Sequence, residues 1–184
     1  MRFSENRRIA WIVLLACVVG SIVLLGAGSL RSERQALEKI FTNGTDSASA
    51  TRYSMDAYLD KCAESAQLLA ESASVYLDDD AAIDAVKEQA ASLNAIDGPD
   101  GRYSVYQQLT ASVNSLYTAL EKAGKTQETD VLLSYGDFKG ACDRLERDED
   151  YRKLAQEFNS DLGSFPASLI GGVFGVKELD TFGW

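Results

Sequence analysis

The stretch MDAYLDKCAESAQLLAESASVY, residues 55–76, decides the fold of this chain. Apolar or small side chains recur in it at steps of three and four residues: Met55, Leu59, Cys62, Ala66, Leu69, Ala73 and Tyr76. This spacing places them on one stripe of an α-helix, whereas a strand would require alternation by two. The stretch therefore predicts a helix that buries one face, and its small residues would let a neighbouring helix approach closely.

Similar stripes follow on the C-terminal side, separated by polar or glycine-containing segments near 97–101 and 124–128. Their members are Ile83, Val86, Ala90 and Leu93; then Tyr106, Leu109, Val113, Leu116 and Leu120; then Leu132, Tyr135, Phe138, Cys142 and Leu145, continued by Tyr151, Leu154, Phe158, Leu162 and Phe165. The phase of the last stripe slips near 147–150, which indicates a kink. Because Pro166 disfavours helical geometry at the residue before it, we expect this helix to end at Phe165.

Helices that each carry one apolar stripe must bury these stripes against one another. The sequence therefore predicts an all-α fold, an antiparallel up-and-down bundle of three to four long helices. Three consecutive aspartates, Asp78, Asp79 and Asp80, precede the second stripe and suit the start of a helix, where carboxylates accept free N–H groups. A calcium loop would space its ligands at alternate positions around a turn glycine, a pattern that these residues lack.

Residues 9–30 form a continuous run of apolar and small residues. At about 1.5 Å per residue a helix of this length spans roughly 33 Å, the thickness of the hydrocarbon core of a bilayer. Trp11 lies near one end, where indole rings favour the membrane interface. A cleaved signal peptide would have a shorter apolar stretch, so we expect an uncleaved single-pass anchor.

The orientation of this anchor is not decided by counting basic residues. Three lie on each side of the run: Arg2, Arg7 and Arg8 before it, and Arg31, Arg34 and Lys39 after it. A short tail with three arginines translocates poorly, whereas large domains translocate readily. We therefore expect a cell-membrane protein with its N-terminus inside and its soluble domain outside the cytoplasm.

These features predict five regions along the chain. They are a basic N-terminal tail (1–8), a transmembrane helix (9–30), a juxtamembrane helix and hinge (31–46), a helical bundle (47–166) and an apolar C-terminal tail (167–184). The tail carries an unusual number of large apolar residues for a chain terminus. It either folds back over one end of the bundle or forms an exposed interaction patch for a partner or the bilayer surface, comprising Leu169, Ile170, Val173, Phe174 and Trp184.

Composition argues against several classes of function. The net charge is −10, and residues 1–30 carry three arginines and one glutamate, so the remainder carries −12. Such an acidic body offers no basic stripe for phosphates, which argues against nucleic-acid binding. The chain has no histidine and no CxxC pair, which argues against common zinc sites and against Ser-His or Cys-His nucleophiles. We expect no metal and no cofactor.

Paired carboxylates and the cysteines require separate consideration. Asp143 with Glu146, or Asp148 with Asp150, would be the pairs for acid–base hydrolysis, but they lie in the most charged stretch of the chain and lack an apolar pocket to raise a pKa. We therefore expect that the chain has no enzymatic activity. Cys62 and Cys142 would suit a disulfide in an extracytoplasmic domain, or small buried apolar positions at helix interfaces.

Residues 151–175 resemble the closing signature of the LemA family. The motif elements are an aromatic–Asn pair, a Phe-Pro pair and a Gly-aromatic-Gly close, and the matching residues here are Phe158, Asn159, Phe165, Pro166, Phe174 and Gly175. The region 60–69 is more acidic than the basic Leu-Ile-Pro-Asn-Leu-like stretch typical of the family. The resemblance implies a membrane-anchored helical bundle rather than an enzyme.

The function expected from the sequence is therefore that of a scaffold or interaction protein without catalytic activity. Its expected partners are the lipid bilayer, through residues 9–30, and an unidentified protein, with homo-oligomerisation left open. The alternative is an extracytoplasmic ligand-sensing bundle that acts through a partner protein, because the sequence predicts neither a second membrane helix nor an output domain.

Overall fold

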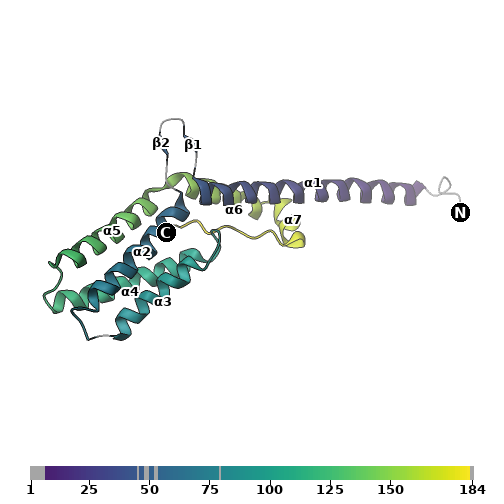
Figure 1. Cartoon of the computed structure of the whole chain (residues 1–184). Coiled ribbons are helices and arrows are strands. Elements are labelled where there is room, and N and C mark those ends of the chain that lie inside the picture. Colours follow the sequence, from purple (N-terminus) through teal and green to yellow (C-terminus); the bar gives the residue numbers. More distant parts are fainter. Residues whose placement is uncertain (1–6, 45, 48–49, 52–53, 79, 183–184) are drawn as a thin grey trace. The chain divides into compact units, whose positions relative to one another are not determined.

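The computed structural model describes residues 7–44, 46–47, 50–51, 54–78 and 80–182. Within these residues the regular secondary structure is helical apart from one pair of two-residue strands, which confirms the expected all-helical class (Figure 1). The helices are α1 (Arg7–Asn43), α2 (Met55–Ala73), α3 (Asp80–Asn94), α4 (Arg102–Lys122), α5 (Thr129–Arg147), α6 (Glu149–Gly163) and α7 (Ala167–Phe174). The strands β1 (Asp46–Ser47) and β2 (Ala50–Thr51) pair antiparallel, with Asp46 opposite Thr51.

The chain divides into two compact units. The first comprises Met1–Ala36 and Glu157–Glu178, and the second Leu37–Gln156 and Leu179–Trp184. The expected bundle (47–166) and the expected tail (167–184) each contribute residues to both units. The two units are described separately below.

Helix α1 contributes most of its length to the first unit. Within Ala10–Asn43 an 18-residue window reaches a mean hydropathy of 2.6, so this helix is long and apolar enough to cross a membrane. Only 6% of that window is buried, which distinguishes it from the core helix of a soluble protein. Its large side chains are exposed accordingly, including Trp11, Leu15, Leu24 and Leu25. The expectation of one apolar N-terminal helix of membrane-spanning length is confirmed.

Helices α2 to α5 form the core of the second unit. Helix α2 contacts α3, α4 and α5, and α3 also contacts α4. The apolar stripes predicted in the first three of these helices are buried, except for the half-buried Tyr76 at the end of the first. Burying each leucine or valine of these stripes contributes about 1.5–3 kcal/mol, so the mutual burial of the stripes holds the helices together.

The predicted stripe of α5 is wrong at its N-terminal end. Leu132 is 50% exposed and Tyr135 is half-buried, whereas Val131 and Ser134 are buried with Phe138, Cys142 and Leu145. Because Val131, Leu132 and Leu133 are consecutive, only one of them can face the core, and periodicity assigned the wrong one. Burial of Ser134 is compatible with its hydroxyl, which donates a 2.7 Å hydrogen bond to the Asp130 carbonyl oxygen.

The C-terminal part of the last stripe also differs from expectation. The helical structure is interrupted at Asp148, between α5 and α6, in the segment where a kink was expected. Helix α6 then ends at Gly163, two residues before the expected end. Phe165, predicted to be buried, is 81% exposed, and Leu154 is only half-buried. The peptide bond between Phe165 and Pro166 is cis, and the following residues form α7, a helix that periodicity did not predict.

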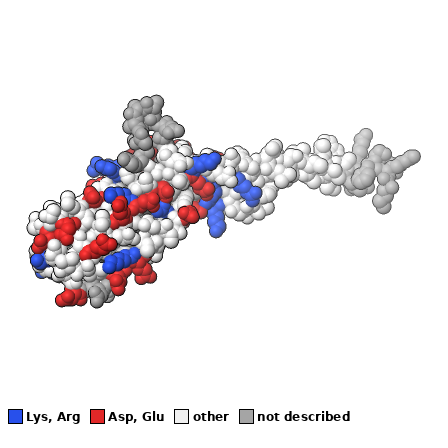
Figure 2. Space-filling model, in the orientation of Figure 1, with Lys and Arg blue, Asp and Glu red and all other residues white. Residues whose placement is uncertain are grey.

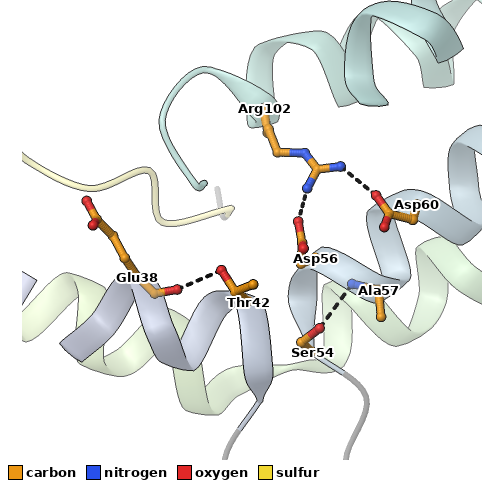
Figure 3. Close-up of polar contacts among 7 residues, drawn as sticks. All are labelled: Glu38, Thr42, Ser54, Asp56, Ala57, Asp60 and Arg102. Atoms are coloured by element: carbon orange, nitrogen blue, oxygen red, sulfur yellow. Dashed lines mark hydrogen bonds and ion pairs between the residues drawn. The ribbon is translucent and has the colours of Figure 1, made fainter. Parts of the chain in front are cut away.

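Helix termini follow the local sequence. The Ser54 hydroxyl caps α2 by accepting a 3.1 Å hydrogen bond from the Ala57 N–H (Figure 3). Helix α4 ends at Lys122 and is followed by Gly124 at φ 70°, as expected from a glycine that favours the left-handed conformation. Helix α3 begins at Asp80, but Asp79 lies outside the described residues, so the expected capping role of the aspartates remains a prediction.

Candidate interaction surfaces

The first candidate surface is the exposed apolar face of α7 in the first unit. Leu169 is 63% exposed and Val173 is 76% exposed, while Ile170 between them is 5% exposed. Phe174 is half-buried and Trp184 lies outside the described residues. The proposed patch is therefore divided, because Ile170 belongs to the packed face of α7 and only Leu169 and Val173 are open. We call Leu169 and Val173 the α7 face.

The packed side of α7 lies against α1, close to the end of the apolar run. A Cβ atom added at Gly26 would lie 2.8 Å from Ile170 Cδ1, closer than side chains normally approach. Ala27 and Leu30 on the same part of α1 are 4% and 8% exposed. The absence of a side chain at Gly26 therefore lets Ile170 approach the backbone of α1 closely.

Two arginines of α1 hold the end of α7 and the segment that follows it. The Arg31 guanidinium donates a 3.1 Å hydrogen bond to the Phe174 carbonyl oxygen and lies 5.7 Å from the centroid of the Phe174 ring. Arg34 donates to the carbonyl oxygens of Lys177 and Glu178. Cations near a helix C-terminus satisfy carbonyls that the helix leaves unpaired and interact favourably with its dipole. Arg31 and Arg34 therefore fix α7 in addition to any effect that they have on membrane orientation.

Helix α6 supports α7 from within the same unit. A Cβ atom added at Gly171 would lie 2.6 Å from Leu162 Cδ1, whereas one added at Gly172 would meet nothing within 4 Å. The two adjacent glycines thus have different roles, since Gly171 faces α6 and Gly172 faces outward. Gly175 ends α7 in the left-handed conformation at φ 67°, which explains why glycine suits the last position of the quoted motif.

The remaining motif residues occupy different environments. Phe158 is 1% exposed in α6, Asn159 beside it is half-buried, and Pro166 is exposed. The motif thus contributes both to the packing of α6 and α7 and to the turn between these helices.

Comparison with known proteins gives no relative. No protein-family model, curated protein or solved structure matches this chain. The resemblance to the LemA family therefore stays a prediction from the sequence.

A second candidate surface lies where the C-terminal end of α2 meets the N-terminal end of α5. Val75 is 73% exposed, Leu132 50% and Leu133 63%. Tyr76 donates a 3.2 Å hydrogen bond to Asp130, which brings the two helix ends together. We call Val75, Leu132 and Leu133 the tip cluster. Sequence reasoning missed it, although three consecutive apolar residues at 131–133 signal that at least one of them must be exposed on an amphipathic helix.

Charged side chains are spread over the helices of the second unit, while the apolar part of α1 carries none (Figure 2). Among the residues whose burial the structure describes, one charged group is buried. Arg102 at the start of α4 is 2% exposed, and its guanidinium binds the carboxylates of Asp56 and Asp60 on α2 (Figure 3). Burial raises the pKa of the Asp56 carboxyl, against the opposing effect of Arg102. This group links α4 to α2.

The carboxylate pairs considered for hydrolysis lie at or near the surface. Asp143 and Glu146 are exposed, and Asp148 and Asp150 are half-buried. Glu146 borders a cavity of about 170 Å³ in the second unit, lined otherwise by Tyr103, Tyr106, Gln107, Thr110, Leu145 and Phe182. The lining is mainly apolar and aromatic, with one carboxylate at its edge. Such a cavity suits a small apolar or cationic molecule more than a polar substrate.

Proposed function

We propose that this chain is a single-pass membrane protein that holds a helical interaction scaffold at the bilayer surface, outside the cytoplasm and without catalytic activity. In this proposal α2 to α5 form an antiparallel up-and-down bundle, and the motif of residues 151–175 relates the chain to the LemA family. The short connections between consecutive helices support the antiparallel arrangement, because neighbours joined by short loops run in opposite directions.

The α7 face carries the proposal. Helix α7 packs on α1 at Gly26, within the apolar run, and Arg31 and Arg34 hold its C-terminal end just beyond that run. If residues 9–30 cross the bilayer, Leu169 and Val173 lie at the depth of the membrane interface. Burying exposed apolar area in lipid contributes about 25 cal/mol per Å², so lipid is the occupant that best explains an apolar face at this place.

A depth measurement tests this placement. The full-length protein, with its three cysteines replaced by alanine, receives a single cysteine at Leu169 and an environment-sensitive fluorophore on it, in nanodiscs that contain spin-labelled lipids. We expect a blue-shifted emission that the spin labels quench. Leu133→Cys is the matched control, because Leu133 is an equally exposed leucine, 63% in both cases, but belongs to the other unit. Water-like, unquenched emission from position 169 would reject the lipid contact.

The tip cluster is the surface that we assign to a protein partner. It comprises exposed apolar side chains just after α2 and at the start of α5, two segments that the hydrogen bond between Tyr76 and Asp130 joins, and groups of exposed apolar residues mark interaction sites more often than single ones do. A photo-cross-linking amino acid at position 133 in intact cells should yield a discrete adduct that a Leu132→Ser change reduces. The same amino acid at Gln108, an exposed polar position on α4, should yield none. Equal adducts from both positions would contradict the assignment.

The side of the membrane is tested independently. A cysteine introduced at the exposed Asp143 of α5, in the variant without native cysteines, is treated in intact cells with a membrane-impermeant maleimide. Labelling without permeabilisation is expected for an extracytoplasmic domain. Labelling only after permeabilisation would place the scaffold in the cytoplasm and would exclude all extracytoplasmic partners.

The cavity beside Glu146 supports the second candidate function, a ligand-sensing bundle that acts through a partner protein. A cavity of about 170 Å³ is similar in size to apolar cavities that bind benzene. Small aromatic amines should then raise the melting temperature of the full-length protein in micelles, and Thr110→Phe, which fills the cavity, should abolish the shift. An equal shift in the Thr110→Phe variant would show that the amines bind elsewhere.

A further inference from the structure

The two cysteines of the second unit face each other across the interface of α2 and α5. Cys62 is fully buried and Cys142 is 3% exposed, and their Sγ atoms lie 3.7 Å apart although the residues are 80 positions apart in the chain. A disulfide requires about 2.05 Å between the sulfurs, so the two sulfurs must approach each other by roughly 1.7 Å to form a bond. Both cysteines are free thiols in this structure.

Packing alone does not require sulfur at both facing positions. The same face of α2 is closed by Ala63, Ala66, Ala70 and Ala73, all fully buried, so alanine fills comparable sites along this interface. The chain has only three cysteines, and two of them meet here. We propose that Cys62 and Cys142 form a reversible disulfide by exchange with a small-molecule or protein disulfide, and that this bond links α2 covalently to α5. This inference goes beyond the proposed scaffold role.

The surroundings of the two thiols affect their pKa values. The hydrogen bond with Cys62 lowers the pKa of the Cys142 thiol, and Tyr106 and Lys139 act in the same direction, against burial and the Glu146 carboxylate. The same hydrogen bond and burial raise the pKa of Cys62. Since the thiolate is the attacking species and Cys142 is the less buried of the two thiols, 3% exposed against 0% for Cys62, we take Cys142 as the thiol that reacts first.

The thiol–disulfide exchange proceeds in two steps. The Cys142 thiolate attacks one sulfur of the disulfide RSSR, a bond forms between Cys142 and RS, and the other RS leaves as a thiolate that takes up a proton. The Cys62 thiol then loses its proton and attacks Cys142 Sγ, which forms the bond between Cys62 and Cys142 and releases the second RSH. One RSSR is reduced to two thiols while the protein dithiol is oxidised. Because both sulfurs are buried, the reaction requires a local opening at α5.

The disulfide would be a covalent cross-link between α2 and α5 within the second unit. A bond across a loop of about 80 residues removes much of the conformational freedom of the unfolded chain. The oxidised protein is therefore more resistant to unfolding than the reduced protein, and reduction returns α2 and α5 to non-covalent packing.

The test uses full-length protein carrying Cys17→Ala in detergent micelles, with oxidised glutathione as the disulfide. After incubation, denaturation and treatment with a maleimide reagent, we expect no free thiol, a mass lower by two hydrogen atoms, and one cross-linked peptide pair containing residues 62 and 142. The melting temperature should rise by roughly 5–10 °C and return after reduction. Free thiols, or glutathione adducts as final products, would overturn the proposal, as would an unchanged melting temperature.

A matched variant tests whether disulfide formation requires a thiol that faces Cys62 across the interface. Cys142→Ala combined with Asp143→Cys moves the thiol by one residue to an exposed position of α5, where it points away from the α2 interface. This variant should form a mixed disulfide with glutathione at position 143 and no disulfide bond to Cys62. An intramolecular disulfide formed as fast as in the parent would show that pairing needs only approximate proximity in space and not the native facing geometry.

Discussion

The guanidinium of Arg31 makes two interactions with Phe174, a 3.1 Å hydrogen bond to its carbonyl oxygen and a cation–π contact at 5.7 Å from its ring centroid. The residues are 143 positions apart, so this contact ties the C-terminal part of the chain to the helix that is apolar enough to cross a membrane. With Arg34 it fixes α7 on α1. The basic residues after the apolar run therefore have a structural role in addition to any effect on membrane orientation.

Replacing both Arg31 and Arg34 by alanine should loosen α7. Hydrogen bonds from charged groups contribute about 1.5–3 kcal/mol each when well formed, and losing even about 1.4 kcal/mol corresponds to a tenfold change in an equilibrium constant. Hydrogen exchange measured by mass spectrometry should therefore show amides of Ala167–Phe174 exchanging at least about tenfold faster. Arg144→Ala with Arg147→Ala on α5 serves as the control, since both side chains are exposed, and unchanged exchange in α7 is expected there.

Gly171 and Gly172 provide a direct test of how α7 packs. Gly171→Ala places a methyl group 2.6 Å from Leu162 Cδ1, so the buried Leu162 must shift, whereas Gly172→Ala meets open space. Overpacking costs typically about 1–3 kcal/mol, while alanine in a helix is favoured over glycine by about 1 kcal/mol. Thermal unfolding should show a loss for Gly171→Ala and no loss for Gly172→Ala. Equal effects of the two substitutions would mean that α7 does not pack on α6 as described.

How much of this packing could be read from the sequence depends on the element. The stripes of α3 and α4 were predictable residue by residue, because regular spacing and flanking glycines left one consistent phase. The apolar N-terminal helix was predictable from its composition. Helix α7 was not, because its eight residues ASLIGGVF contain two glycines and too few turns for a periodic signal.

The errors in α5 and α6 have different physical origins. Where apolar residues are consecutive, as at 131–133, periodicity cannot tell which one faces the core. Phe165 was assigned to the core by spacing, yet it follows the end of α6 at Gly163, where helical periodicity no longer applies. The apposition of Arg102 with Asp56 was not predicted either, since it depends on the register between α2 and α4, which no local pattern encodes.

Asp56 and Asp60 should differ in their importance although both bind Arg102. Arg102 is 2% exposed, and in the Asp56→Ala variant it keeps one carboxylate partner, Asp60. The side chain of Asp60 is 62% exposed. Removing a partner from a buried pair costs about 3 kcal/mol or more, whereas an exposed pair contributes at most about 1 kcal/mol. Chemical denaturation should therefore show a large loss for Asp56→Ala and a small one for Asp60→Ala. The reverse order would indicate that Arg102 is stabilised mainly by Asp60.

Phe182 should stabilise the second unit despite its position near the chain terminus. It is 5% exposed, and its ring lies 5.5 Å from that of Phe41 and 5.3 Å from that of Tyr103, between centroids. It also adopts a φ of 47°, an unfavourable conformation for a bulky residue, so the packing must outweigh the backbone cost. Phe182→Ala should lower stability by about 3 kcal/mol and the melting temperature by roughly 5–10 °C.

Phe165→Ala is the matched control for this substitution, because Phe165 is 81% exposed and its removal in detergent micelles should leave the melting temperature within about 2 °C of the parent. Deleting residues 171–184 should lower the melting temperature at least as much as Phe182→Ala, since Leu179 is also buried. If Phe182→Ala instead behaves like Phe165→Ala, residues 179–182 do not belong to the core of the second unit, and the C-terminal segment would be free to engage a partner.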